Sequence, residues 1–493
     1  MPSDNGLGGW RRRPPPGREV VGAEFIGVGV DRSRIWGQAW DGMADDTIVI
    51  GDATPWPRPG SREFKTEILA GLTTFLAMSY ILFVQPAVLS TDFQNRPTGL
   101  EPAAVFVATA VSAAVATAMM GLYARLPIAL APGMGENFFF VTCGMGLTSL
   151  GFPNAWRTAL GIVFWSGCTF VLLNVTGLRE RVLRSLSPSM CAAISAGIGL
   201  LLAFIGLKNA TLLTSSTGTW IALNTQADRV AVLVFSIGLL TSVALQARAR
   251  AAALLGAILV ATAVAWLYGR TRWTGWSSTM WSLSAAGQFD LRGALSPRAW
   301  PYLLVFLFMD LFDTVGTLVG VLHAAGWSDL RNRPSVRRAL MTDAVGTVLG
   351  AFLGTSTVTS YIESAAGIHA GARTGLAALV TAIAFLLSLG LAPLVGLIAN
   401  YPPITASALV IVGALMMANT RHVEWSDLTE AAPALLVLGG IPLTFSIADG
   451  LALGLISWPL LKIATGRWRE VPGISLVLAA VMAGYFAFVR SQL

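Results

Sequence analysis

Apolar segments recur along the chain from residue 67 to residue 489 and are separated by short polar gaps. Each segment is about as long as the roughly 20 residues that an α-helix needs to cross the hydrocarbon core of a bilayer. Only helices and closed barrels satisfy all of their backbone hydrogen bonds in lipid. The pattern therefore predicts an all-α, polytopic membrane protein.

Two of the predicted spans do not read as continuous helices. In the third span, Pro132, Gly133 and Gly135 interrupt the helical pattern, so we expect a short extended piece and then a half-helix that begins near Gly135. In the tenth span, the β-favouring segment 355–361 precedes a helix that we expect to begin near Glu363. Both spans are therefore predicted to be broken.

The two halves of the chain resemble each other faintly. Arg157 opens the fourth span with RTAL, and Arg373 opens the eleventh with RTGL, while Pro188 and Pro403 precede the fifth and twelfth spans. The two broken spans fall at similar separations. A repeat of seven spans, an odd number, inserts its second copy upside down, and inverted repeats with paired broken helices are typical of secondary transporters. Chance similarity between apolar segments is the alternative explanation.

Composition and charge agree with a membrane protein. The chain is 54% hydrophobic and 12% charged, with a mean hydropathy of +0.66, whereas a soluble protein carries about 25% charged residues. The net charge of +7 comes mostly from arginines in short loops. If the N-terminus is inside the cell, these loops follow the even-numbered spans, as the positive-inside rule requires. The charge thus predicts topology, and no nucleic-acid partner is expected.

The remaining composition predicts no cofactor. Residues 1–60 contain RRRPPP and no apolar span, so we expect a disordered cytoplasmic extension. The three cysteines and three histidines form neither a disulfide framework nor a metal motif. An enzyme would need a nucleophile–base pair or a metal cluster, and the sequence indicates none.

Acidic residues inside the apolar segments are the strongest functional signal. Asp310 and Asp313 lie one helical turn apart in an apolar run, and Glu363 follows a run of hydroxyl residues. An ionised carboxylate at the centre of a bilayer costs at least about 2.5–3.5 kcal/mol. Structural roles rarely explain several such groups, so we expect a substrate or proton site.

The types of polar residue indicate what this site binds. Glu136 and Asn137 lie near the predicted start of the first half-helix, and Glu363 lies near the start of the second. Carboxylates accept N–H donors, and an amide both donates and accepts, so the set suits a flat, neutral heterocycle. No Lys or Arg is expected at the same depth to bind an anion. Alternatively, each acid is a helix N-cap or first-turn residue with a purely structural role.

Several long motifs resemble those of one transporter family. The similarity covers residues 67–462 and is carried by EILAGLTTFLAMSYILFV, ALAPGMGENFFF, GIGLLLAFIGLKNA, FMDLFDTVGTLVGV and GTSTVTSYIESAAGIHAGARTGL. On these motifs the chain resembles the AzgA-like purine permeases of the xanthine/uracil permease (nucleobase–ascorbate transporter) superfamily.

The resemblance implies fourteen spans in two inverted sets of seven. Residues 65–175 and 300–391 would form a core domain, and residues 189–268 and 402–490 a gate domain that mediates homodimerisation. The resemblance further implies import of guanine, hypoxanthine or adenine with protons, by an elevator-type movement, across the cell membrane, which would be the inner membrane in a bacterium.

The site residues follow from the same resemblance. Asp310 and Glu363 should contact the base, and Asn137 and Asp313 should support binding or coupling. Independently of the resemblance, Tyr361 and Phe75 could stack on the ring, and Thr359 of the hydroxyl run is also expected at the site. Phe138 and Phe139 could stack on the ring as well, although packing explains them better.

One departure and two alternatives stay open. The family usually has an apolar residue where this chain has Glu136, so the exact purine and the proton stoichiometry are in doubt. The alternatives are a uracil, xanthine or other heterocycle permease, and a channel or anion exchanger of the same fold.

Overall fold

The computed structural model describes residues 55–493 except 95, 178–184, 217–219, 249–250, 274–280, 325–333, 485 and 488–493. The extension expected over residues 1–60 therefore lies almost entirely outside the described residues.

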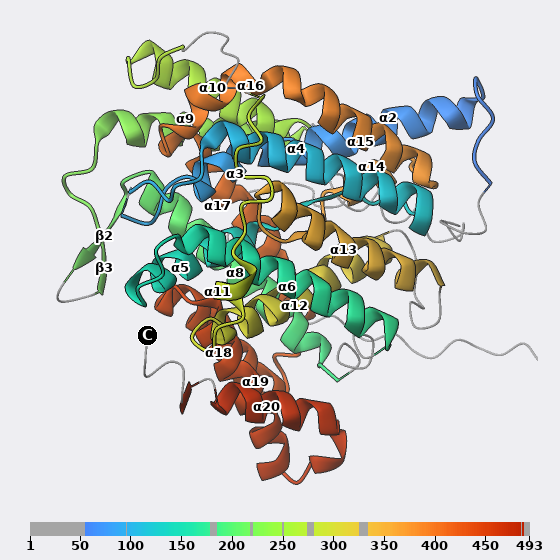
Figure 1. Cartoon of the computed structure of the whole chain (residues 1–493), viewed down its shortest axis with the longest axis vertical. Coiled ribbons are helices and arrows are strands. Elements are labelled where there is room, and N and C mark those ends of the chain that lie inside the picture. Colours follow the sequence, from blue (N-terminus) through green and yellow to red (C-terminus); the bar gives the residue numbers. More distant parts are fainter. Residues whose placement is uncertain are drawn as a thin grey trace, which may run out of the picture. The chain divides into compact units, whose positions relative to one another are not determined.

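The described residues are mainly helical, and the two halves of the chain contribute similar sets of helices (Figure 1). The first half contains α2 (Arg62–Met78), α3 (Ile81–Leu89), α4 (Pro102–Met119), η2 (Met120–Ala124), β1 (Leu130–Pro132), α5 (Met134–Ser149), α6 (Ala155–Val175), α8 (Pro188–Asn209), β2 (Leu213–Ser216), β3 (Trp220–Leu223), α9 (Arg229–Ala247) and α10 (Ala253–Leu267). The second half contains α11 (Leu291–Ala294), α12 (Trp300–Ala324), α13 (Pro334–Leu353), β4 (Val358–Ser360), α14 (Ser364–His369), α15 (Gly375–Leu387), η4 (Ser388–Leu391), α16 (Ala392–Ala399), α17 (Pro403–Met417), η5 (Ala418–His422), α18 (Leu428–Thr444), α19 (Ile447–Ala464), η6 (Trp468–Glu470) and α20 (Gly473–Gly484).

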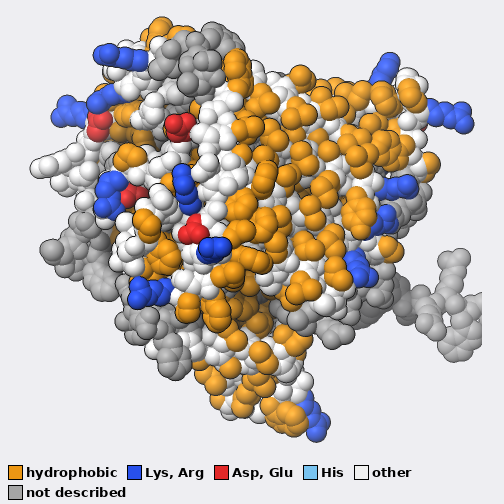
Figure 2. Space-filling model, in the orientation of Figure 1, with side chains coloured by type: hydrophobic (Ala, Val, Ile, Leu, Met, Phe, Trp, Pro, Cys, Tyr) orange, Lys and Arg blue, Asp and Glu red, His pale blue; other side chains and the backbone are white. Residues whose placement is uncertain are grey.

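Helix length and composition identify a multi-pass membrane protein. Among the described residues, 8 helical stretches are long and apolar enough to cross a bilayer, and four shorter helices are also apolar. Figure 2 shows a broad surface dominated by hydrophobic side chains, with Lys and Arg toward its edges. Such a surface suits contact with lipid. The total of fourteen spans stays a prediction.

The segment after residue 420 forms more than one helix. The sequence left open whether residues 431–464 hold one broken span or two short ones, and the structure has two helices, α18 and α19, that meet at Phe445. Phe445 takes a left-handed conformation with φ 51°, which ends α18 and reverses the chain. A separate helix, α20, follows and packs against α19.

Two short strands lie where the sequence predicts breaks. β1 precedes α5, β4 precedes α14, and the two strands pair antiparallel with Ala131 opposite Thr359. Pro132 lacks an N–H group and therefore tolerates only an edge position, which a two-stranded ribbon provides. Whether each strand and the helix after it form one interrupted span stays a prediction.

The helix contacts repeat between the halves with their partners exchanged. α4 packs against α15, and its counterpart α13 packs against α6. In the same way, α2 contacts α15 and α14, while α12 contacts α6 and α5. The pairs α9–α10 and α18–α19 correspond, and α8 and α17 pack against each other. This exchange agrees with the repeat that the sequence predicts, whereas the proposed core and gate boundaries stay predictions.

Glycines permit the closest of these approaches. A Cβ atom added at Gly375 of α15 would lie 2.0 Å from the carbonyl oxygen of Gly121 in η2, and one at Gly413 of α17 would lie 2.3 Å from the carbonyl oxygen of Gly199 in α8. Small residues at helix crossings are typical of membrane proteins, because van der Waals packing drives helix association in lipid.

Candidate functional site

The β1–β4 ribbon places the starts of α5 and α14 side by side. Beyond the strand pairing, the backbone N–H of Gly133 donates to the carbonyl oxygen of Thr357 at 2.9 Å, and that of Tyr361 donates to Ala129 at 3.0 Å. The Tyr361 hydroxyl also donates to the carbonyl oxygen of Pro132. Residues more than 200 positions apart in sequence therefore share one small rigid unit.

Asp310 is linked to this unit through Thr347. Its side chain is fully buried on α12 and accepts hydrogen bonds from Thr314 and Thr347, each at 3.2 Å. The Thr347 hydroxyl lies between Asp310 and strand β4, where it also contacts the backbone N–H and C=O of Val358. α12 and β4 are thereby joined through the predicted substrate-binding carboxylate.

Asp343 lies close to the predicted site residues, although the sequence analysis did not include it among them. It lies in the middle of α13, is fully buried, and both of its carboxylate oxygens lie 2.9 Å from the Thr314 hydroxyl. The same hydroxyl contacts Asp310 and, at 3.0 Å, Thr359. The Thr314 hydroxyl has one proton to donate, so it cannot donate to the oxygens of Asp310, Asp343 and Thr359 at the same time. An acid inside an otherwise small and apolar helix was the available signal.

Asn137 is held by a residue that sequence reasoning missed. Gln85 of α3 is fully buried, and its Nε2 donates to Asn137 Oδ1 at 2.9 Å and to Thr355 Oγ1 at 2.9 Å. Asn137 Nδ2 donates back to Gln85, and Ser356 donates to Asn137. Because these bonds use much of the Asn137 amide, the geometry favours a supporting role. An amide within the apolar first span was the signal for Gln85.

Glu363 immediately precedes α14, but its side chain does not cap that helix. Its Oε1 instead accepts a hydrogen bond from the Tyr80 hydroxyl at 2.7 Å. Asp313, one turn after Asp310 on α12, is half-buried and lies within electrostatic reach of Asp343 and Glu363. The helix-cap interpretation therefore fails for Glu363.

Glu136 is the least satisfied of the acids. It is 1% exposed, and neither carboxylate oxygen has a hydrogen-bond partner among the described residues. Its side chain turns back over Gly133 and lies within electrostatic reach of Asp313, Asp310 and Asp343. A buried charge without donors is strongly unfavourable, so a bound proton or an N–H or O–H donor would stabilise Glu136.

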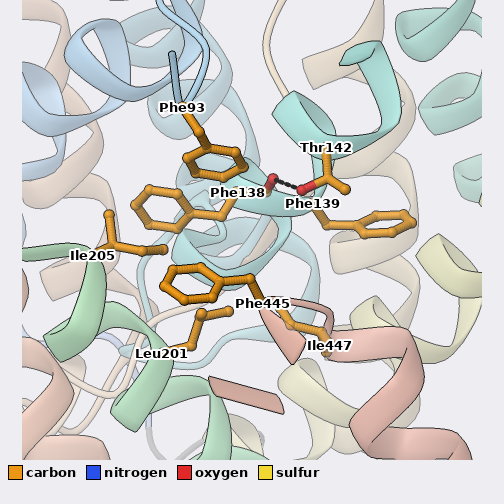
Figure 3. A pocket seen from close by; sticks show the side chains of 8 residues that line it. All are labelled: Phe93, Phe138, Phe139, Thr142, Leu201, Ile205, Phe445 and Ile447. Carbon is orange, nitrogen blue, oxygen red and sulfur yellow. Dashed lines mark hydrogen bonds between the residues drawn. The ribbon is translucent and has the colours of Figure 1, made fainter. Parts of the chain in front are cut away.

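An aromatic pocket adjoins the start of α5 (Figure 3). It lies between α5, α8 and the turn that joins α18 to α19, and its lining consists of Phe93, Phe138, Phe139, Thr142, Leu201, Ile205, Phe445 and Ile447. The Phe93 and Phe138 rings are stacked, with centroids 6.3 Å apart and an interplanar angle of 15°. Phe93, Phe138 and Ile205 also line a second, wider cavity of about 720 Å³. The stacked pair therefore lies between the two cavities.

Not every predicted residue lies at this site. Thr359 and Tyr361 do, through the contacts given above. Phe75 of α2 instead packs edge-on against Phe385 of α15, with centroids 5.3 Å apart, and no described contact joins it to the acids. The described part of the chain also contains no group of three or more His, Cys, Asp or Glu side chains that could hold a metal ion.

Comparison with known proteins gives matches over most of the chain. A family model described as "Permease family" matches residues 65–453. Guanine/hypoxanthine permease PbuG of Bacillus subtilis is 39% identical over 435 residues, which are 87% of this chain and 97% of PbuG. Adenine permease AdeP of Escherichia coli is 37% identical over 430 residues, 87% of this chain and 94% of AdeP.

A solved structure has the same fold. The transmembrane domain of the cyanobacterial bicarbonate transporter BicA superposes with a TM-score of 0.60 at 14% identity, covering 80% of this chain and 97% of that domain.

Proposed function

Because this chain belongs to the Permease family of xanthine/uracil permeases, we propose that it imports purine nucleobases across the cell membrane together with protons. The family and its relatives are multi-pass membrane transporters, so the chain is a permease and not an enzyme. The predicted resemblance to the purine permeases is thus confirmed. The two relatives named above carry guanine, hypoxanthine or adenine in their names, which supports a purine as the substrate here.

One observation carries the proposal for the site. Glu136, Asp310 and Glu363 present buried or half-buried carboxylates on the elements around the β1–β4 ribbon, and Phe138 and Phe139, which line the aromatic pocket, follow Glu136 in α5. Purines have ring N–H groups, and adenine and guanine have an exocyclic amino group, all of which donate to carboxylates. The flat ring would lie against the aromatic side chains, while its edge would face the acids. Asn137, Asp313 and Thr359 would hold these acids in place.

Proton coupling follows from the number of acids in one place. Several carboxylates that share a buried site cannot all carry a charge at once, because like charges and burial both favour a bound proton. A base that donates an N–H group to one carboxylate changes the electrostatic potential at the neighbouring carboxylate. We therefore propose that substrate binding and protonation are linked through Glu136, Asp310, Asp313 and Glu363.

The elevator movement is proposed from the position of the aromatic pocket. The pocket is lined on one side by α5, from the predicted core domain, and on the other by α8 and the α18–α19 turn, from the predicted gate domain. A core that slides along the gate would carry a base held against α5 from one side of the membrane to the other. The homodimer implied by the family would keep the gate domains fixed.

A permease for uracil, xanthine or another heterocycle is the alternative with the same chemistry. Anion exchange is less favoured, because the likeness to the bicarbonate transporter extends to the fold alone, and an acid-rich site repels anions.

Uptake of labelled bases in transport-deficient cells tests the proposal. We expect saturable uptake of at least one of guanine, hypoxanthine and adenine, and collapse of that uptake when a protonophore dissipates the proton gradient. Uptake of uracil with no purine uptake would overturn the substrate assignment. Purine uptake that is indifferent to the protonophore in energised vesicles would overturn the coupling.

A further inference from the structure

Tyr80 is a buried tyrosine whose hydroxyl reaches the predicted site. It is 1% exposed and lies at the junction between α2 and α3. Its hydroxyl donates to Glu363 Oε1 at 2.7 Å, and among the described residues no hydrogen bond from another side chain to the Glu363 carboxylate is found. Hydrogen bonds to an ionised group are stronger than those between neutral groups, so this contact dominates the orientation of the carboxylate.

The packing of α2 against α14 holds the two residues together. A Cβ atom added at Gly367 of α14 would lie 2.0 Å from Thr74 Oγ1 and 2.8 Å from the carbonyl oxygen of Ala70, both on α2. The absence of a side chain at Gly367 thus lets the helices touch. Glu363 lies about one helical turn before Gly367, and Tyr80 lies beyond Thr74, so the close contact brings their side chains together.

We propose that Tyr80 is a positioning residue for Glu363, fixing the plane of its carboxylate so that Oε2 faces an N–H group of the purine. This inference rests on the proposed function. Tyrosine suits the task because the ring is held by the core while the hydroxyl supplies one directed hydrogen bond. A carboxylate without this anchor would rotate and would meet the base less often in the productive geometry.

Competition kinetics with Tyr80→Phe test the inference. The probes are unlabelled guanine, hypoxanthine and adenine and their N-methylated forms, each competing with a labelled base. For the parent base we expect KM to rise about tenfold, the effect of losing one good hydrogen bond, while the maximal rate stays near the wild-type value. The N-methyl analogue that wild type rejects most strongly should keep its inhibition constant, because its methyl group replaces the N–H that would donate to Glu363. The ratio between the constants of this analogue and the parent base should therefore fall by the same factor of about ten.

Tyr302→Phe is the matched control. Tyr302 is also buried, and its hydroxyl has no hydrogen-bond partner among the described residues, so its removal should leave both constants unchanged. Tyr80→Met provides a second variant that lacks a donor but fills the space flexibly, in case Tyr80→Phe fails to accumulate in the membrane.

Two outcomes would overturn the proposal. Unchanged kinetics in Tyr80→Phe or Tyr80→Met would show that the hydroxyl does not act on the base. An equal rise in the constants for the parent base and for the rejected analogue would show a structural role alone. Failure of the proposed function looks different, since wild type itself would then take up no purine.

Discussion

The carboxylate of Glu136 folds back over Gly133 at the start of α5, leaving no room for a larger residue there. A Cβ atom at Gly133 would lie 2.2 Å from Glu136 Oε2 and 2.9 Å from Thr359 Cγ2. Gly133 has an extended conformation with φ −68°, so the constraint is spatial and not conformational. The glycine therefore determines where the unpartnered carboxylate lies.

Gly133→Ala should consequently displace Glu136 and lower purine uptake at least roughly tenfold, because small shifts of groups that contact substrate carry large penalties. Uptake normalised to the amount of protein in the membrane is the measurement. Gly144→Ala is the matched control on the same helix, since a Cβ there has nothing within 4 Å. Equal uptake by both variants would contradict the placement of Glu136.

Asp310→Asn and Glu363→Gln should each reduce base uptake by roughly 10- to 100-fold, since a buried N–H donor left facing an amide donor costs about 1–3 kcal/mol. Membrane insertion should be preserved, because both changes are close to isosteric. Glu424→Gln, at an exposed position, controls for the loss of a negative charge. Normal uptake by both site variants would remove these two residues from the site.

Glu136→Leu separates two roles for the residue that departs from the family pattern. If Glu136 acts on substrate or proton, the variant should change the ranking of guanine, hypoxanthine and adenine in competition assays, or move the pH optimum. Its carboxylate does not cap α5 in the structure, which favours this outcome. A variant that only loses thermal stability, with ranking and pH profile intact, would assign Glu136 a structural role.

Asp427 provides a pH-dependent contribution to stability at the start of α18. The Thr429 hydroxyl and then the Arg467 guanidinium and the Thr429 backbone N–H hold the pKa of Asp427 well below its usual range. Because the pKa of Asp427 is lower in the folded protein than in the unfolded chain, its ionised form stabilises the fold. This stabilisation is fully present above the unfolded pKa of about 3.9 and is lost as the pH falls through the folded pKa.

Thermal unfolding of purified protein in detergent checks this. The melting temperature of wild type should exceed that of Asp427→Asn by a constant amount between about pH 5 and 8, and the gap should narrow below about pH 4. A difference in melting temperature between the two proteins that changes between pH 6 and 8 would indicate that another group titrates.

The sequence predicted the features that depend on local chemistry. Pro132 and Gly133 are incompatible with a helix interior, and the β-branched residues around Val358 favour a strand, so the positions of both extended segments could be predicted. Asp310 and Glu363 stood out because charge is costly in lipid. Their convergence could be anticipated only through the repeat.

The contacts between distant segments could not be predicted in this way. Tyr80 and Glu363 are separated by 283 positions, and nothing in either local pattern reveals the pairing. By sequence, Asp343 could either cap a helix end or line a water-filled gap, because the sequence does not show where a helix lies relative to the bilayer. Phe75 was a candidate because its aromatic ring could stack on a base, and its contact with substrate stays a prediction.

The exchange of helix partners between the halves has a consequence for how the chain assembles. Since α4 packs against α15 and α6 against α13, each half buries helix surface against the other half as well as within itself, and each supplies surface that the other lacks. The strands β1 and β4 reinforce this dependence, because each finds its only described partner strand in the opposite half. A protein cut between α10 and α12 should accumulate only when both fragments are made in the same cell. An ancestor comprising one half would have needed a second, oppositely inserted copy of itself to be stable.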